Sequence, residues 1–264
     1  MRTHDQAVHD QFDPQAQAYL QSGVHARGPD LQFAQELVAG AVASLPGVAA
    51  RGDRQALDVG CGAGHLSFAL APTFGKVVAL DPSEGMLAAV EHAARTRGLL
   101  QIETRQSAAE SIAFADSAFS LAATRYSAHH WCDLGAGLRE MRRVLAPGGA
   151  LLVIDVLGAD DPLVDTHLQT LELLRDPSHV RNRAAGEWLA LIEALGFTGM
   201  RRAQWSLRLE FSSWVGRMRT PPARVAVIRE LQQSAAREVQ EGLAFEADGS
   251  FTVRTGLFWA RKPG

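Results

Sequence analysis

The stretch "ALDVGCGAGH" at residues 56–65 places three glycines at alternate positions directly after a short apolar run. The next apolar run, "KVVAL" at residues 76–80, ends at a single acid, Asp81. In an open α/β sheet, ligands bind beyond the carboxyl ends of the strands, where the loop after the first strand lies. Glycine in such a loop accepts positive φ and lets a ligand lie against bare backbone, which a Cβ would prevent. We therefore expect a small-molecule site at this loop.

Short apolar runs alternate with longer helical patterns from residue 55 to residue 156. This alternation is typical of βαβ units and of a parallel sheet buried on both faces, so the predicted fold class is α/β, a doubly wound Rossmann-like sheet. Ser83 is the expected N-cap of one helix, and "APGG" at 146–149 is expected to end another. The expected strands are 56–59, 76–80, 100–104, 119–124 and 150–156, and the expected helices are 65–74, 83–95 and 133–145.

The flanking segments predict two helices before this core and insertions after it. The patterns at 13–22 and 29–45 predict two N-terminal helices, and those at 162–176 and 222–240 predict two more behind the core. Strands are expected at 200–211 and 250–262, paired at the sheet edge. The predicted organisation is a helical segment at 1–50 and a core at 51–264, with cap insertions at about 158–185 and 211–248 over the strand ends.

The composition is that of an ordinary globular protein. The 264 residues are 47% hydrophobic, enough to bury one good-sized core. A formal charge of −3 and a pI near 6.3 argue against nucleic-acid and anionic-membrane surfaces, which require a basic excess. We therefore expect a small-molecule partner and a monomer or homodimer.

The cysteines and the N-terminus indicate a cytoplasmic protein. Cys61 and Cys132 are too few for a disulfide framework or a Cys-rich metal site. The first residues, "MRTHDQAVHDQF", contain no apolar signal-peptide region, and no apolar run is as long as a membrane span. The expectation is a protein without a membrane span, in a reducing compartment.

An acid after the second strand and an acid before the glycines suggest which cofactor binds. A carboxylate at Asp81 can accept hydrogen bonds from both ribose hydroxyls, in a nicotinamide enzyme as well as in an S-adenosylmethionine (SAM) enzyme. The spacing here is G-x-G-x-G, whereas dinucleotide sites favour G-x-G-x-x-G after an apolar strand end. Asp58 at the strand end would repel a pyrophosphate but attract the ammonium group of an amino acid. The residues therefore favour SAM.

With these motifs the sequence resembles the class I SAM-dependent methyltransferases, whose first motif is acid-x-G-x-G-x-G, here "LDVGCGAG". "VVALDPSEGML" is similar to the family's second strand, and "REMRRVLAPGGALLVID" to the helix and strand that close the core. The nearest likeness is to the ubiquinone/menaquinone-type enzymes, the methyltransferase type 11-like group, over residues 55–156. The N-terminal "FDPQAQAYLQSGVHARGPDL" at 12–31 also resembles the helical lid of those relatives, so residues 1–50 are the expected lid. The resemblance implies a seven-stranded sheet whose last strand is antiparallel.

The resemblance also implies a set of cofactor-binding residues. Asp58 would lie near the SAM amino group, and Asp81 would bind the ribose hydroxyls. Ser107 departs from the family, which usually has an acid or amide at this place to accept the adenine amino group; a serine hydroxyl can still accept this bond. Met86 would pack on the adenine, but its position is explained equally well if it is a core residue. The remaining implied residues are Gly60, Cys61, Gly62, Gly64, Pro82, Ala108 and Thr124.

Candidate catalytic residues follow the fourth strand in "TRYSAHHWCD". His129 or His130 is a plausible general base, because histidine titrates near neutral pH. One of the two must point away from the site, where it would cap the next helix. Arg125 would orient an acidic or phenolic acceptor, or else be a structural ion-pair partner. Adjacent histidines on a turn chelate poorly, so no metal is predicted.

The cap insertions are expected to form the acceptor pocket. His179 and Arg181 in "RDPSHVRNR" and Trp214 in "FSSWVGRM" are the candidate substrate-binding residues. The alternative for the first segment is a helix N-cap, "DPSH", followed by a solvated helix face. Tyr19 in the lid is a candidate for covering the sulfonium by a cation–π contact, or for anchoring a lid helix.

The sequence therefore predicts a SAM-dependent methyltransferase that releases S-adenosylhomocysteine. Its acceptor is expected to be a small molecule methylated on carbon or oxygen. One alternative is a protein that senses SAM without transferring a methyl group. A further alternative is an NAD-dependent oxidoreductase, although this leaves Asp58 unexplained.

Overall fold

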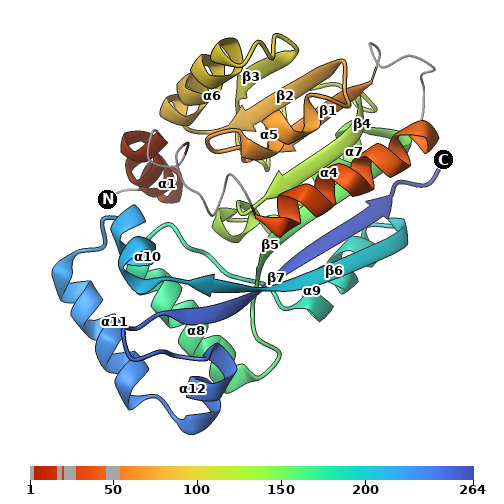
Figure 1. Cartoon of the computed structure of the whole chain (residues 1–264). Helices are drawn as coiled ribbons and strands as arrows, with labels where there is room; N and C mark the ends of the chain where they lie inside the picture. Colours follow the sequence, from red (N-terminus) through yellow and green to blue (C-terminus); the bar gives the residue numbers. More distant parts are fainter. Residues whose placement is uncertain (1–2, 17–19, 21–27, 46–53) are drawn as a thin grey trace.

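A computed structural model describes residues 3–16, 20, 28–45 and 54–264, and in these residues the chain forms one seven-stranded sheet (Figure 1). The strand order is β3-β2-β1-β4-β5-β7-β6. Only β7 runs antiparallel to its neighbours, β5 and β6, which confirms the predicted sheet and the paired last strands. The strands are β1 Gln55–Val59, β2 Lys76–Asp81, β3 Ile102–Gln106, β4 Phe119–Arg125, β5 Leu145–Leu157, β6 Thr198–Leu209 and β7 Phe251–Arg261.

Helices cover both faces of this sheet. Successive side chains of a strand point to opposite faces, so Ala56 packs on one side and Leu57 on the other. The Ala56 face is covered by α4 Pro29–Ala41, α5 His65–Leu70 and α6 Glu84–Thr96, and the Leu57 face by α7 Leu134–Val144 and α9 Ala185–Ala194. Apolar burial on both sides explains why the core strands are continuously hydrophobic.

The strand order places a topological switch point beside β1. From β1 the chain continues to β2 and β3 on one side and then returns to β4 on the other side. The loops after β1 and β4 therefore leave the sheet in different directions, and a crevice opens at the carboxyl ends of these two strands. The glycine stretch forms the loop after β1.

A helical lobe lies beyond the carboxyl end of β5 (Figure 1). It consists of α8 Pro162–Arg175, α10 Phe211–Arg217, α11 Pro222–Ser234 and α12 Arg237–Leu243. These helices pack with the adjoining ends of β6 and β7 around a separate apolar cluster, in which Trp214 is 1% exposed. The four helices of the lobe fall within residues 158–185 and 211–248.

The first helix, α1 His4–Phe12, lies between the lobe and the sheet (Figure 1). The Gln11 side chain donates to the Met218 carbonyl at 2.9 Å, which ties α1 to the lobe. On the other side, the Ser83 hydroxyl donates to the Asp13 carboxylate in the 3₁₀ turn Asp13–Gln15. This helix therefore contacts both halves of the molecule. Of the helix expected at 13–22, residues 17–19, 21 and 22 lie outside the described residues.

Two local interpretations of the sequence need correction. The helix before "APGG" does end, at Val144, but the next strand begins earlier than expected: β5 starts at Leu145, where it pairs with Phe119, and includes the "APGG" segment. The "DPSH" segment does not start a helix: Asp176 accepts from the Ser178 N–H at 2.8 Å in a tight turn, and α9 begins only at Ala185. The Ser83 N-cap is confirmed, because its hydroxyl accepts from the Met86 N–H.

Candidate functional site

Asp81 and the glycine loop form one hydrogen-bonded unit at the carboxyl ends of β1 and β2. Asp81 Oδ2 accepts from the Gly62 N–H at 2.8 Å, and Oδ1 accepts from the Ser83 N–H at 2.9 Å. Burial raises the pKa of Asp81 to about 6, and the two N–H donors oppose this rise. Asp81 thus holds the glycine loop in place, and its carboxylate lies beside the glycine backbone as a hydrogen-bond acceptor.

Glycine is required at Gly60 by close packing. Its φ is +66°, and a Cβ there would lie 1.8 Å from Ser127 Oγ in the loop after β4. A side chain would force apart the loops after β1 and β4, which together border the crevice.

Asp58 is a buried acid with spare hydrogen-bonding capacity. It is 1% exposed, and its Oδ2 accepts from the Ser67 hydroxyl at 2.6 Å. Its Oδ1 has no hydrogen-bond partner among the described residues. Burial raises its pKa to about 7, against the lowering effect of Ser67. A ligand with a cationic donor would satisfy this oxygen and favour the carboxylate.

The crevice is a cavity, here called the first cavity, that gathers most of the predicted cofactor residues. Gly64, Ser107 and Thr124 are not among its lining residues. Helix α1 contributes three side chains to it. The lining residues are His4, Val8, Phe12, Asp58, Gly60, Cys61, Gly62, Ala63, His65, Leu66, Asp81, Pro82, Met86, Ala108, Ala109, Glu110, Arg125, Tyr126, Ser127, His130, Trp131 and Cys132.

The region expected to hold adenine differs in detail from the prediction. The Ser107 hydroxyl donates to the Ser111 carbonyl, whereas Glu110 lines the first cavity. The Glu110 carboxylate accepts from the Asp133 N–H at 3.2 Å, so an acid does stand near this end of the cavity. Thr124 is fully buried in β4. Tyr19 lies outside the described residues.

Arg125 forms a buried ion pair. Its Nε lies 2.6 Å from Asp30 Oδ2, and both side chains are 4% exposed. The pair joins α4 to the end of β4, so it has the structural role that the sequence left open. Arg125 also lines the first cavity and lies over the Tyr126 ring at 4.6 Å.

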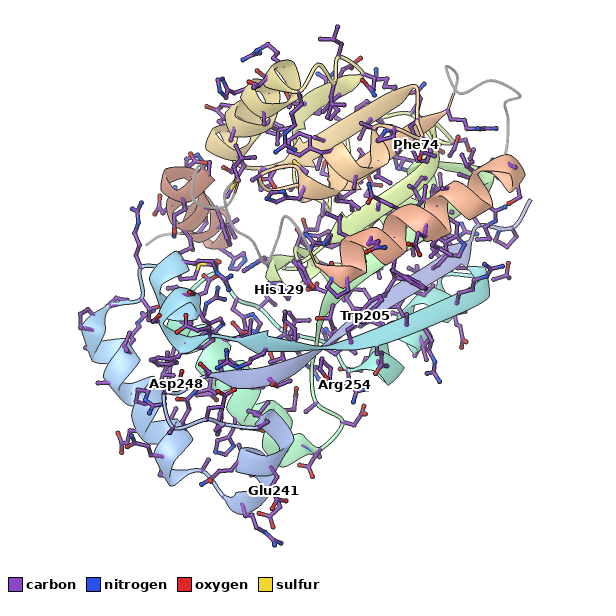
Figure 2. The ribbon with its side chains drawn as sticks, viewed as in Figure 1. Phe74, His129, Trp205, Glu241, Asp248 and Arg254 are labelled. Atoms are coloured by element: carbon purple, nitrogen blue, oxygen red, sulfur yellow. The ribbon has the colours of Figure 1, made fainter. Side chains whose placement is uncertain are left out.

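His129 is paired with Asp155, which favours its charged form. Its Nδ1 lies 2.6 Å from Asp155 Oδ1, and its backbone N–H donates to Oδ2 at 3.1 Å. Burial by itself lowers the pKa of His129, but Asp155, with help from Glu172 and Asp176, raises it above its ordinary value. Figure 2 shows His129 between the sheet and the helical lobe.

His130 is neutral, with a defined tautomer. Its Nδ1 lies 3.0 Å from the Ser178 carbonyl oxygen, which can only accept, so Nδ1 carries the proton and Nε2 has the free electron pair. Burial and the charge on His129, whose ring centroid is 4.2 Å away, lower the pKa of His130 to about 4. Such an imidazole can accept a proton at neutral pH.

A second cavity lies on the lobe side of His130. It shares Phe12, Tyr126 and His130 with the first cavity, so these three side chains form a common wall. Of the predicted substrate residues, only Trp214 lines it. The lining residues are Phe12, Tyr126, His129, His130, Val156, Glu172, Arg175, Asn182, Leu207, Leu209, Trp214, Arg217 and Met218.

The other two predicted substrate residues lie apart from both cavities. His179 Nε2 is 2.9 Å from Gln169 Oε1, and burial and the neighbouring His129 lower its pKa to about 2. Its ring centroid is 5.7 Å from that of His129, so it packs behind the site. Arg181 is exposed and pairs with Glu187 at 3.1 Å.

Several site residues were missed by sequence reasoning. Asp155 had a detectable signal, because it is an acid in the middle of a buried apolar strand. Tyr126 has a φ of 52°, a strained conformation that no sequence pattern announces. His4, Val8 and Phe12 reach the cavities only through tertiary packing.

Membrane-spanning helices and metal clusters are both absent from the described part of the chain. No helix there has the length and apolar character needed to cross a membrane. No cluster of three or more His, Cys, Asp or Glu side chains in those residues has the geometry to hold a metal ion.

Comparison with known proteins gives consistent likenesses. A family model described as "Methyltransferase domain" matches residues 57–153. The "Uncharacterized protein YafE" of Escherichia coli (strain K12) is 52% identical over 189 residues, which are 72% of this chain and 91% of that protein. The "Uncharacterized methyltransferase YcgJ" of Bacillus subtilis (strain 168) is 32% identical over 213 residues, covering 81% of this chain and 80% of that protein.

Structural comparison agrees with these matches. The crystal structure of YcgJ superposes with a TM-score of 0.81 and 28% identity, covering 90% of this chain and all of that one. A demethylmenaquinone methyltransferase of Desulfitobacterium hafniense (strain Y51) is 38% identical over 104 residues, which are 38% of this chain and 41% of that protein. The first two relatives thus match over most of their length, and the third over less than half of its length.

Proposed function

The chain belongs to the class I SAM-dependent methyltransferases, and we propose that it binds SAM in the first cavity and methylates a small-molecule acceptor. One observation carries this proposal: Asp58, Asp81 and the glycine loop line a single cavity, in which Asp58 Oδ1 has no hydrogen-bond partner among the described residues. These groups match the ammonium, the ribose and the close backbone approach that SAM requires. Phosphates would be repelled by the two acids.

Each part of the cofactor has an assigned partner in this proposal. Asp58 binds the amino group, and Asp81 accepts from the ribose hydroxyls while it holds the Gly62 N–H. Gly60, Cys61 and Gly62 lie against the methionine and ribose portion. Pro82, Met86 and Ala108 enclose the adenine, with Glu110 in place of Ser107 as acceptor for its amino group.

His130 is the general base of the proposed reaction. When bound, SAM supplies an electrophilic methyl carbon, and the C–S electron pair leaves with S-adenosylhomocysteine. His130 Nε2 takes the proton of the acceptor, because the Ser178 carbonyl holds the Nδ1 proton. Burial and the neighbouring His129 lower the pKa of His130 to about 4, so its ring is neutral and available as a base at pH 7. Arg125 supports the wall of the cavity through Asp30.

The acceptor is proposed to react through carbon or oxygen. An uncharged imidazole removes a proton from an acidic O–H or C–H group, whereas a neutral amine needs no base before methyl transfer. The partial likeness to a demethylmenaquinone methyltransferase supports the same choice. We further expect a monomeric or homodimeric cytoplasmic protein without a nucleic-acid partner, in keeping with its acidic composition.

Calorimetric titration of the purified chain with SAM, S-adenosylhomocysteine and NAD tests the proposal. We expect saturable binding of the first two and none of NAD, and then transfer of a labelled methyl group to an acceptor from a screen of phenols, quinones and amines. Binding of NAD alone would identify an oxidoreductase. Tight SAM binding that is indifferent to loss of both His129 and His130, with no transfer to any acceptor, would identify a sensor.

A further inference from the structure

The second cavity has the position expected of an acceptor site if the first cavity holds SAM, so an inference about its ligand rests on the proposed function. The two cavities meet at the wall formed by Phe12, Tyr126 and His130. Methyl transfer needs the acceptor atom about 3–3.5 Å from the methyl carbon, so the atom that receives the methyl group lies at this wall. The groups that line only the second cavity then determine the chemistry of the rest of the acceptor.

The charged side chains of the second cavity are paired, which favours an uncharged ligand. His129 Nδ1 lies 2.6 Å from Asp155 Oδ1, and Arg175 Nη1 donates to Glu172 Oε2 at 3.1 Å. Arg217 is not without a partner either. A charged group on the ligand would lose its hydration here and meet ions that are already paired, a cost that an uncharged group avoids.

Two hydrogen-bond donors of the second cavity are left for a ligand. His129 uses Nδ1 for Asp155, so Nε2 is the nitrogen that a ligand can contact. Burial lowers the pKa of His129, but Asp155 outweighs burial and raises it above its ordinary value, which favours a ring with a proton on Nε2 as well. Asn182 is 2% exposed, and its Nδ2 has no hydrogen-bond partner among the described residues. A ligand with an acceptor oxygen satisfies both donors.

Asn182 is held in place by residues that do not line the cavity. Its backbone N–H donates to Gln169 Oε1 at 3.0 Å, and its carbonyl accepts from Gln169 Nε2 at 2.8 Å. Gln169 Oε1 in turn lies 2.9 Å from His179 Nε2. The position of the Asn182 amide is therefore fixed before a ligand binds, which lowers the entropic cost of a hydrogen bond to it.

Much of the remaining lining is apolar and fits a hydrophobic body. Val156, Leu207 and Leu209 come from β5 and β6, and Trp214 comes from α10. A carbonyl oxygen on such a body has two lone pairs and no proton, so it can accept from both donors without adding a donor of its own. The second cavity thus suits an uncharged molecule that carries a carbonyl group.

The carbonyl oxygen is close to the reacting atom but is not that atom. His129 and Asn182 line only the second cavity, so an oxygen bound to them lies away from the methyl group. The ring centroids of His129 and His130 are 4.2 Å apart, and a carbonyl oxygen is only two bonds from the carbon next to the carbonyl group. When His130 takes a proton from that carbon, negative charge moves to the oxygen, where the two donors stabilise it.

We propose that the acceptor is an uncharged carbonyl compound that is methylated on the carbon next to its carbonyl group. His130 Nε2 takes the proton of that carbon, and the C–H electron pair forms the C=C bond of an enolate. His129 and Asn182 bind the enolate oxygen, which makes it a poor nucleophile. The C=C pair therefore forms the bond to the methyl carbon, the C=O bond re-forms, and the C–S pair leaves with S-adenosylhomocysteine. The proton on His130 then passes to water.

The test uses the full chain loaded with S-adenosylhomocysteine, which cannot react, at pH 7. It is titrated with benzoylacetone, an uncharged dicarbonyl compound, with 4-butylphenol, which lacks a carbonyl group, and with the anion 4-phenylbutanoate and the cation 4-phenylbutylammonium. We expect benzoylacetone to bind at least about tenfold more tightly than the other three. In Asn182→Leu this preference falls at least about fivefold, and in Gln233→Leu, an exposed amide on α11, it is unchanged.

A reaction of benzoylacetone with isotope-labelled SAM tests which atom is methylated. Nuclear magnetic resonance distinguishes a methyl group on carbon from one on oxygen, and we expect the label on the carbon between the two carbonyl groups. A label on oxygen, or no transfer to a bound benzoylacetone, overturns the proposed role of His129 and Asn182 in the reaction.

The outcomes separate this inference from the cofactor proposal. If S-adenosylhomocysteine itself does not bind, the proposed function fails. If it binds but benzoylacetone does not, or if the phenol, the anion or the cation binds at least as tightly, the carbonyl inference is overturned and the cofactor site stands. Should Asn182→Leu not fold, the ranking of the four compounds on the unaltered chain still decides the question.

Discussion

The two cavities on either side of His130 are built in different ways. The first is formed largely by residues close to the ends of successive strands, with backbone N–H groups of Gly62 and Ser83 fixing Asp81. The second is assembled from α1, β5, β6, α8 and α10, which are widely separated along the chain. A site of the first kind is visible as a short motif, whereas a site of the second kind exists only after the chain has folded.

The same difference separates the part of a site that suits a shared cofactor from the part that suits a ligand specific to each enzyme. Strand-end loops hold a ligand through main-chain geometry, so they suit a cofactor common to many enzymes. Side chains brought together from a helical lobe can change without disturbing the sheet, so they suit a ligand that differs among relatives. The two histidines lie at the boundary, and substitutions can probe each side of it.

The largest expected effect is at the boundary itself. Replacing the proposed base in His130→Gln should lower kcat by about 10²–10⁴-fold, the usual contribution of a general base. SAM affinity should change little, because the acids and glycines of the first cavity remain. Single-turnover methyl transfer and calorimetry measure the two quantities. His92→Asn, an exposed histidine on α6, is the matched control. An unchanged kcat in His130→Gln would show that His130 is not the general base.

On the cofactor side, Asp81→Ala should weaken SAM binding by about 100-fold or more. Hydrogen bonds to a charged group contribute about 1.5–3 kcal/mol each, and this variant loses those to the ribose hydroxyls. Calorimetry gives the affinity, and thermal unfolding checks that the loop after β1 is still folded. Glu84→Ala, an exposed acid in the same segment, should bind normally. Undiminished SAM binding by Asp81→Ala would show that the loop has been misinterpreted.

Asp58 should make SAM binding dependent on pH. Its pKa is raised to about 7, and an ammonium ligand favours the carboxylate, so SAM binding must release protons near neutral pH. Affinity should fall as the pH drops below 7, by up to about tenfold per unit where this group dominates. Asp58→Asn should bind about tenfold more weakly at pH 8 and show less of this dependence. Titrations in buffers of different ionisation enthalpy measure the proton release. No release in the wild type would contradict the assignment.

Asp155 should control the pH profile without taking part in the reaction. Asp155→Asn removes the partner that keeps His129 charged, so the pKa of His129 falls and its depressing effect on His130 is lost. The pKa of His130 then rises from about 4, and the fall of kcat at low pH begins at a higher pH than in the wild type. Two carboxylates, Asp176 and Asp155, raise the pKa of His130. Each of them has a smaller effect than the lowering by His129, so the loss of Asp155 itself does not reverse the expected rise. The profile is measured at saturating SAM, and a limb that stays in place would rule out this positioning role.

The smallest expected effect is at Arg181. This residue was a candidate for substrate binding, but it is exposed, pairs with Glu187 and lines neither cavity. Exposed ion pairs contribute about 0–1 kcal/mol, so Arg181→Ala should change kcat/KM by less than about twofold and stability only slightly. A loss of tenfold or more in kcat/KM would extend the acceptor site beyond the second cavity.

The sequence by itself determined the sheet, the pairing of its last two strands and the cofactor motif. Period-two and helical patterns are local, and a parallel sheet of alternating strands and helices has few permitted topologies. Asp58, Asp81 and the glycines are likewise read from spacing, because the segment that joins them is short. Strand boundaries were predicted less accurately: α7 does end before "APGG", but β5 begins at Leu145 and not at residue 150, where the sequence placed its start.

Only the tertiary structure decided which histidine lines the first cavity and which side chains of the lobe line the second. The Ser178 carbonyl and Asp155 define the protonation of His130 and His129, and both partners lie far along the chain. Likewise, Asn182 and Arg217 line one cavity although α9 and β6 separate them in the sequence. Burial, charge and tautomer depend on neighbours in space, and sequence spacing carries no information about neighbours that the fold alone brings together.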